Sequence, residues 1–94
     1  MKFSQTDVAE EVELDLDELL KSPKEIVLYN DDHNTFDFVI DSLVKVCRHT
    51  PIQAEQCTYL VHYKGKCAVK RGDFEKLKPM CTALLDRGLS AEIE

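Results

Sequence analysis

Apolar residues follow two different periods along this chain, and each change of period marks an expected element. Residues 25–30 (EIVLYN) form a short apolar run with the length of a central strand, and residues 66–70 (KCAVK) read as a second strand. Residues 89–93 place apolar side chains at the alternate positions 89, 91 and 93. That alternation predicts a third strand with one buried face.

Between the first two strands, apolar residues recur at helical spacing in two separate stretches. The first helix is expected to begin at a cap formed by Asn34 or Thr35. Its apolar stripe comprises Phe36, Val39, Ile40, Leu43, Val44 and Cys47. The second helix should begin with the capping box Thr50-Pro51-Ile52-Gln53, run to about Tyr63 and end before Gly65. We expect its inner side to carry Ile52, Tyr59, Leu60 and Tyr63.

A third helix is predicted from Gly72-Asp73 to Gly88, and Pro79 should bend it or delay its start. Its apolar stripe comprises Phe74, Leu77, Met80, Cys81, Leu84 and Leu85. The resulting order, β-α-α-β-α-β, lacks a regular alternation of strand, helix and strand. We therefore expect the α+β class: a three-stranded, mostly antiparallel sheet with three helices packed on one face.

Charge divides the 94-residue chain into two parts. The formal net charge is −6, of which −5 falls in residues 1–22 and −1 in the remainder. Residues 1–22 are therefore predicted to be a flexible acidic extension, and residues 23–94 a single small domain that begins at Pro23. The acidic balance argues against nucleic acid as a partner, because phosphate binding needs a basic surface.

Composition also limits the location and the cofactors. No apolar run is long enough to span a bilayer, and no basic start leads into an apolar stretch, so we expect neither membrane association nor secretion but a cytoplasmic protein. Cys47, Cys57, Cys67 and Cys81 are spaced too widely for a CxxC pair. They read as reduced thiols packed like small hydrophobic residues, rather than as disulfides or zinc ligands, and no metal or cofactor is expected.

A polar cluster directly follows the first predicted strand. Asn30, Asp31 and Asp32 stand side by side, and a hairpin of the first two helices would bring His62 near them. Carboxylates, an amide and an imidazole can all accept hydrogen bonds from an ammonium group. The same residues also suit ordinary roles in a turn, in a helix cap and at an exposed helix end, so both interpretations stay open at this point.

Two catalytic alternatives have less support. A hydrolytic or metal site could use Asp31, Asp32, His33 and His62, but the chain offers no activated serine, Gly-rich phosphate loop or HExxH spacing. A cysteine nucleophile is the other alternative, and each cysteine falls on an apolar helix face or in a strand, where thiols are usually inert. We do not expect an enzyme.

Two blocks of the sequence, VLYNDDHNTFDFVIDSLVKV and VHYKGK, together resemble the ClpS family of Clp protease adaptors. The resemblance covers roughly residues 24–94. It implies the α+β fold shared with the C-terminal domain of the ribosomal stalk protein. It also implies an adaptor that binds N-degron proteins, which a bulky apolar N-terminal residue marks for destruction. The adaptor hands them to the N-terminal domain of a Clp AAA+ unfoldase of the ClpA or ClpC type.

The resemblance further implies roles for particular residues. The α-amino group of the substrate would be bound by Asn30, Asp31 and His62. The pocket for the first side chain would be formed by Asp32, Asn34, Phe36, Val39, Thr58, Val61 and Leu89. Glu75 and Lys78 match the region that docks on the unfoldase, and the acidic extension would serve in delivery.

Two pocket positions depart from the family pattern. Phe36 and Thr58 stand where the family has methionine. Methionine adapts its shape and neither replacement does, so the set of accepted first residues is expected to differ. The main alternative is a generic protein-interaction domain of the same fold without amine recognition.

Overall fold

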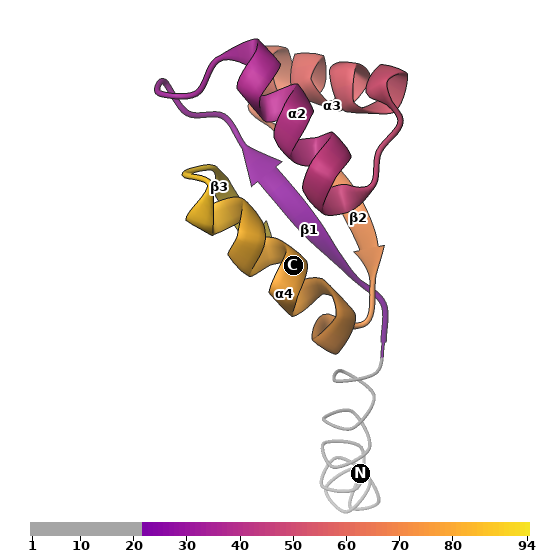
Figure 1. Ribbon diagram of the computed structural model, residues 1–94. Helices are drawn as coiled ribbons and strands as arrows, with labels where there is room; N and C mark the ends of the chain where they lie inside the picture. The colour runs from indigo at the N-terminus through magenta and orange to yellow at the C-terminus, as the bar shows by residue number, and fades with distance from the viewer. Residues whose placement is uncertain (1–21) are drawn as a thin grey trace, which may run out of the picture.

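A computed structural model of the protein describes residues 22–94, which contain three strands and three helices (Figure 1). In chain order these are β1 (Lys24–Tyr29), α2 (Phe36–Cys47), α3 (Pro51–Lys64), β2 (Lys66–Gly72), α4 (Phe74–Asp86) and β3 (Ser90–Ile93). The predicted order of elements is confirmed. The predicted acidic extension, residues 1–22, lies outside the described residues apart from Ser22.

The sheet has the order β2-β1-β3, so the first strand of the chain lies at its centre. Both neighbours run antiparallel to β1, and Leu28 stands opposite Cys67 on one side and Ala91 on the other. Ile26, Val27 and Leu28 are consecutive buried residues of this central strand. The predicted antiparallel sheet is thus confirmed.

The hydrophobic core lies on the face of the sheet that carries Ile26 and Leu28. These two side chains pack in one cluster with residues of all three helices, whereas Val27, between them on the strand, does not belong to it. The helical members of the cluster are Val39, Leu43, Cys47, Ala54, Val61, Leu77, Cys81 and Leu84. Because side chains alternate between the faces of a strand, the helices cover this one face.

The local signals in the sequence set the helix ends. The Thr35 hydroxyl accepts a hydrogen bond from the Phe38 N–H at 3.1 Å, and Thr50 and Gln53 form the predicted capping box. Gly65 follows α3 with φ +94°, a conformation that glycine adopts without strain.

The helix α4 runs without interruption from Phe74 to Asp86 with Pro79 inside it. Of the two effects predicted for Pro79, a bend or a delayed start, the delayed start is therefore wrong. Pro79 lies in the second turn, where its missing N–H removes only the hydrogen bond to the Glu75 carbonyl. Glu75 is exposed, so water can satisfy that carbonyl.

The predicted inner side of α3 is also wrong. Ile52, Tyr59, Leu60 and Tyr63 are the exposed large hydrophobic residues of this helix. The residues that α3 buries are Ala54, Thr58 and Val61, at positions i, i+4 and i+7. These small side chains let α3 approach α2 and β2 closely, which the aromatic side chains would prevent. Apolar residues on both sides of the helix made the sequence pattern ambiguous.

The part of the chain that the structure describes contains no helix long and apolar enough to cross a membrane.

Candidate functional site

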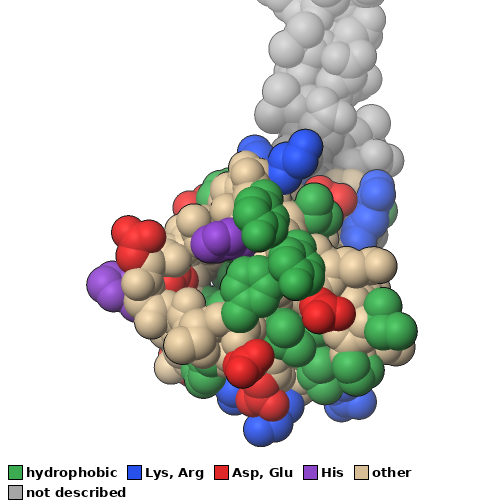
Figure 2. All heavy atoms as spheres, turned by 90° about the horizontal axis from the view of Figure 1, so that it is seen from above, with side chains coloured by type: hydrophobic (Ala, Val, Ile, Leu, Met, Phe, Trp, Pro, Cys, Tyr) green, Lys and Arg blue, Asp and Glu red, His purple; other side chains and the backbone are tan. Residues whose placement is uncertain are grey.

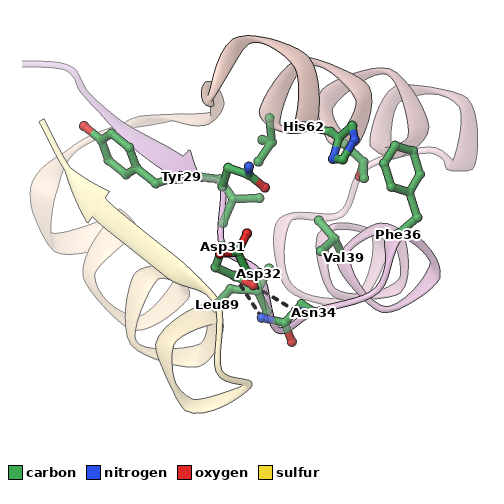
Figure 3. A pocket seen from close by; sticks show the side chains of 12 residues that line it. Tyr29, Asp31, Asp32, Asn34, Phe36, Val39, His62 and Leu89 are labelled. Carbon is green, nitrogen blue, oxygen red and sulfur yellow. Dashed lines mark hydrogen bonds between the residues drawn. The ribbon is translucent and has the colours of Figure 1, made fainter.

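A cavity of about 380 Å³ opens where the carboxyl end of β1 meets α2, α3 and the residue before β3 (Figure 3). The loop after β1 supplies its polar side, and the facing sides of α2 and α3 supply apolar groups. It is lined by Leu28, Tyr29, Asn30, Asp31, Asp32, Asn34, Phe36, Val39, Thr58, Val61, His62 and Leu89. A cavity of this volume can hold a side chain together with the backbone atoms next to it.

All ten residues that the sequence resemblance placed in the amine site and the pocket line this one cavity. Asn30 and Asp31 follow β1, whereas His62 lies far along the chain on α3. The hairpin of α2 and α3 brings them together, as the sequence led us to expect. Glu75 and Lys78 lie elsewhere, exposed on α4. The roles assigned to these residues remain predictions.

Leu28 and Tyr29 also line the cavity and were not anticipated. Both belong to the end of β1, directly before the polar cluster. Their position directly before Asn30 could have indicated that they border the cavity. Apolar residues of a central strand were instead assigned to the hydrophobic core. Leu28 is 1% exposed and serves both the core and the cavity.

Asp31 organises the loop between β1 and α2. Its Oδ1 accepts hydrogen bonds from the backbone N–H groups of His33 at 2.8 Å and Asn34 at 2.9 Å, and its Oδ2 accepts one from Asn34 Nδ2 at 2.9 Å. Burial raises the pKa of Asp31, but the hydrogen bonds from Asn34 and His33 outweigh it and hold the pKa below its ordinary value. Each carboxylate oxygen has two lone pairs, so Oδ2 can accept a further donor.

Asn34 connects the two loops that border the cavity. Its side-chain NH₂ donates to Asp31 Oδ2 and also to the backbone carbonyl of Gly88, both at 2.9 Å. Gly88 precedes Leu89, which is 4% exposed and contributes an apolar wall. A second hydrogen bond links the loop to the residue that follows α3: the Asn30 N–H donates to the Gly65 carbonyl at 2.9 Å. The polar residues are therefore fixed relative to the apolar wall.

The imidazole of His62 is held by other rings rather than by hydrogen bonds. The Phe36 ring meets it edge to face at a centroid distance of 5.5 Å, and Tyr63 does the same at 4.9 Å. Aromatic pairs prefer such edge-to-face geometry. These contacts restrict the ring while leaving its nitrogens available at the mouth of the cavity (Figure 3).

The inner part of the cavity is buried and nearly apolar. Val39, Thr58, Val61 and Leu89 are all buried. The Thr58 hydroxyl donates to the Ala54 carbonyl at 2.7 Å, so its hydrogen is already used within the helix. Acceptor groups at the mouth and apolar groups within suit a ligand that joins a cation to an apolar side chain.

The charged residues of the cavity also favour a cationic ligand. Asp31 and Asp32 line it, and its lining contains neither lysine nor arginine. Among residues 22–94 no group of three or more His, Cys, Asp or Glu side chains could hold a metal ion. The lining thus favours an ammonium group over an anion.

The cysteines do not contribute a nucleophile to this site. None of them lines the cavity, and all four are free thiols. Burial raises the pKa of Cys47 to about 11 and that of Cys67 to about 12, so little reactive thiolate is present. Cys47 and Cys81 pack in the core as the sequence predicted.

Comparisons with known proteins identify a family. The family model for "ATP-dependent Clp protease adaptor protein ClpS" matches residues 21–92. The ClpS adaptor of Nitratidesulfovibrio vulgaris is 32% identical over 76 residues, which cover 77% of this chain and 76% of that protein. The ClpS adaptor of Salmonella arizonae is 38% identical over 71 residues, covering 71% and 67%.

A solved structure supports the fold. Agrobacterium tumefaciens ClpS2 bound to L-phenylalaninamide superposes with a TM-score of 0.74 at 21% sequence identity. The match covers 80% of this chain and 96% of that one. At this level of identity the likeness establishes a shared fold, which is the α+β fold predicted from the sequence.

Proposed function

Since the chain belongs to the ClpS family of adaptors for the ATP-dependent Clp protease, which are not enzymes, we propose that its cavity binds the start of N-degron proteins. The free α-amino group would bind at Asn30, Asp31 and His62. The bulky apolar first side chain would enter the pocket formed by Asp32, Asn34, Phe36, Val39, Thr58, Val61 and Leu89. The adaptor then delivers its cargo to the N-terminal domain of a Clp unfoldase of the ClpA or ClpC type in the cytoplasm.

The observation that carries this proposal is the convergence of three acceptor residues at the mouth of a cavity whose inner part is apolar. An N-terminal ammonium differs from every internal peptide group by its charge and its three donors. Asp31 Oδ2, the Asn30 side-chain oxygen and an imidazole nitrogen can each accept one of them. The ClpS2 of A. tumefaciens binds L-phenylalaninamide, a molecule with a free amine beside an aromatic side chain, which supports the same assignment here.

The expected energies are sufficient for a transient adaptor. Burial of a leucine or phenylalanine side chain contributes about 1.5–3 kcal/mol. Hydrogen bonds to a charged group contribute about 1.5–3 kcal/mol each. After the cost of association we expect a binding free energy of about −8 kcal/mol, which corresponds to a dissociation constant in the micromolar range. Binding of that strength permits release to the unfoldase.

Fluorescence anisotropy of labelled peptides tests the proposal. A peptide that begins with free leucine should bind. Its acetylated form should lose at least about 2 kcal/mol of binding free energy, because acetylation removes the positive charge and two of the three N–H donors, and leaves acceptors that the peptide covers without a partner. Equal binding of the two peptides would refute amine recognition. It would leave a generic interaction domain as the remaining interpretation.

Two histidines provide a matched pair of variants for this assay. His62→Ala removes an imidazole of α3 that lines the cavity. His33→Ala removes an imidazole of the loop between β1 and α2 that does not line it. We expect His62→Ala to weaken binding of the free-leucine peptide about tenfold or more, and His33→Ala to leave it within twofold. A panel of free Leu, Phe, Tyr, Trp, Ile and Met peptides would then define which side chains Phe36 and Thr58 admit.

Unfoldase docking is a separate property of the proposed adaptor. Glu75 and Lys78 are exposed on α4 and do not line the cavity, so they can be changed without touching the peptide site. A variant with both charges exchanged should lose affinity for the unfoldase's N-terminal domain and keep its affinity for the peptide. Unchanged unfoldase binding would remove these two residues from the interface.

A further inference from the structure

The outer face of α3 carries an aromatic surface next to the cavity. Tyr59 and Tyr63 of α3, together with Phe36 at the start of α2, form what we call the aromatic rim. Tyr59 is 45% exposed and Tyr63 is 73% exposed, and neither ring belongs to the core cluster. Figure 2, which looks down on this end of the molecule, shows hydrophobic side chains gathered around a histidine at the surface. The exposed faces of these rings offer an apolar surface to a ligand that leaves the cavity.

The rim is continuous with the cavity. Phe36 and His62 line the cavity itself. Tyr59 meets Phe36 at a centroid distance of 4.9 Å, and Tyr63 meets His62 at 4.9 Å. The rings of Tyr59 and Tyr63 lie almost parallel, 7° apart, with centroids separated by 6.0 Å. These four rings form one strip that begins at the proposed amine site and leads away from it along α3.

We infer that the aromatic rim binds the side chain of the second residue of the N-degron and favours a large aromatic one. This inference rests on the proposed function, which fixes the first residue in the cavity. The next residue then lies about 3.3–3.6 Å per residue further along an extended chain, within reach of rings at the mouth. Aromatic faces and edges offer a second aromatic side chain both stacked and edge-to-face contacts.

Charge adds a second preference. Asp31 and Asp32 lie at the same mouth, and the lining contains no lysine or arginine that would pair with an acidic substrate residue. A glutamate in second position would lie close to these two carboxylates, which repel it. The order expected for the second residue is therefore aromatic, then small, then acidic.

The size of the rim favours a side chain over a second copy of this protein. A large aromatic side chain buries about 150–250 Å², so the exposed parts of Tyr59 and Tyr63 supply on the order of 200–300 Å². A stable interface between proteins needs about 800 Å² from each partner. The rim matches one or two residues of a peptide.

The test uses free-leucine peptides that differ only in the second residue: Leu-Phe, Leu-Ala and Leu-Glu. On the unaltered protein, Leu-Phe should bind about 3- to 10-fold more tightly than Leu-Ala, and Leu-Glu most weakly. Tyr63→Ala should bring Leu-Phe and Leu-Ala within about twofold of each other. Ile52→Ala is the matched control, since Ile52 is 69% exposed on the same helix but lies at its other end. It should keep the full preference.

The outcomes separate this inference from the proposed function. If all three peptides bind with equal affinity, the inference is wrong and the proposed function stands. If no free-leucine peptide binds, both are wrong. Sedimentation of the full chain adds a further check: association that Tyr63→Ala abolishes, with the Leu-Phe preference intact, would assign the rim to self-association and overturn the inference.

Discussion

Replacement of Arg87 by alanine tests how the loop that carries Leu89 is held in place. The Arg87 guanidinium makes three contacts with α2. Its Nε donates to the Ser42 hydroxyl at 2.8 Å and its Nη2 donates to Asp41 Oδ2 at 2.9 Å. Its Cζ lies 4.9 Å from the centroid of the Phe38 ring. Arg87 stands two residues before Leu89, so these contacts anchor one wall of the cavity to the helix opposite.

The expected loss can be assembled from these contacts. The hydrogen bond to Ser42, a fully buried residue, is charge-assisted and of the kind worth about 1.5–3 kcal/mol. The ion pair with Asp41 is partly exposed and adds less than about 1 kcal/mol. The contact with Phe38 adds about 0.5–1 kcal/mol. Because the Arg87 side chain is 29% exposed and water replaces part of each contact, we expect a net loss of about 2 kcal/mol.

Thermal and urea unfolding, followed by circular dichroism, measure this loss. A change of about 2 kcal/mol lowers the melting temperature of a domain of this size by roughly 8–16 °C. Lys45→Ala is the matched control, because Lys45 pairs with the same Asp41 at 3.2 Å but is 63% exposed. It should cost less than about 0.5 kcal/mol. Equal losses in the two variants, or no loss in Arg87→Ala, would refute the reasoning.

Two further predictions concern Gly65, the residue that follows α3, and Asp31, which organises the loop after β1. Gly65→Ala should destabilise the protein by about 1 kcal/mol, because Gly65 has φ +94°, a conformation that alanine adopts only with strain. Gly72→Ala is the control: Gly72 has a negative φ, and an added Cβ would make only ordinary contacts, so this variant should be nearly neutral. Urea unfolding of both variants measures the difference. The lowered folded-state pKa of Asp31 means that its ionised form stabilises the fold above the ordinary pKa of 3.8 and that this stabilisation is lost as the pH falls through the lower folded-state value. The difference in unfolding free energy between the unaltered protein and Asp31→Asn should therefore shrink as the pH falls below about 5, and a constant difference would contradict the reasoning.

The elements of this fold were readable from the sequence because each is specified locally. The capping box at Thr50 and Gln53, the cap at Thr35 and the glycine at position 65 all perform the roles that their residue types predict. The alternation at positions 89, 91 and 93 reports a strand with one buried face. Signals of this kind depend on neighbours in the chain, so they do not require knowledge of the tertiary arrangement.

The orientation of α3 could not be obtained in the same way. The helix has apolar residues on both sides, and burial was decided by size rather than by hydrophobicity. Ala54 and Thr58 are buried where the helix packs closely, while Tyr59 and Tyr63 are left outside. Such a choice depends on the space between α2 and β2, which a single sequence does not record.

The cavity was predictable to a different degree. The polar cluster and the approach of His62 to it were indicated by the residues themselves, which left an amine site and ordinary turn and helix-end roles both open. The apolar pocket residues were identified only by resemblance to a family. The structural role of Asp31 was not foreseen: it accepts three hydrogen bonds from its own loop. Leu28 and Tyr29 were missed because strand residues were read only as core.

The strand order has a consequence for the way the chain reaches its native state. The central strand, β1, is the first to be synthesised, and its pairing with β3 is antiparallel from Ile26–Ile93 to Tyr29–Ser90. One edge of β1 therefore waits for residues more than 60 positions away. Until they leave the ribosome, the nascent chain presents an unpaired apolar strand, the kind of edge that promotes aggregation. Contacts of such high sequence separation also slow folding, so the pairing of β1 with β3 is expected to form late in folding.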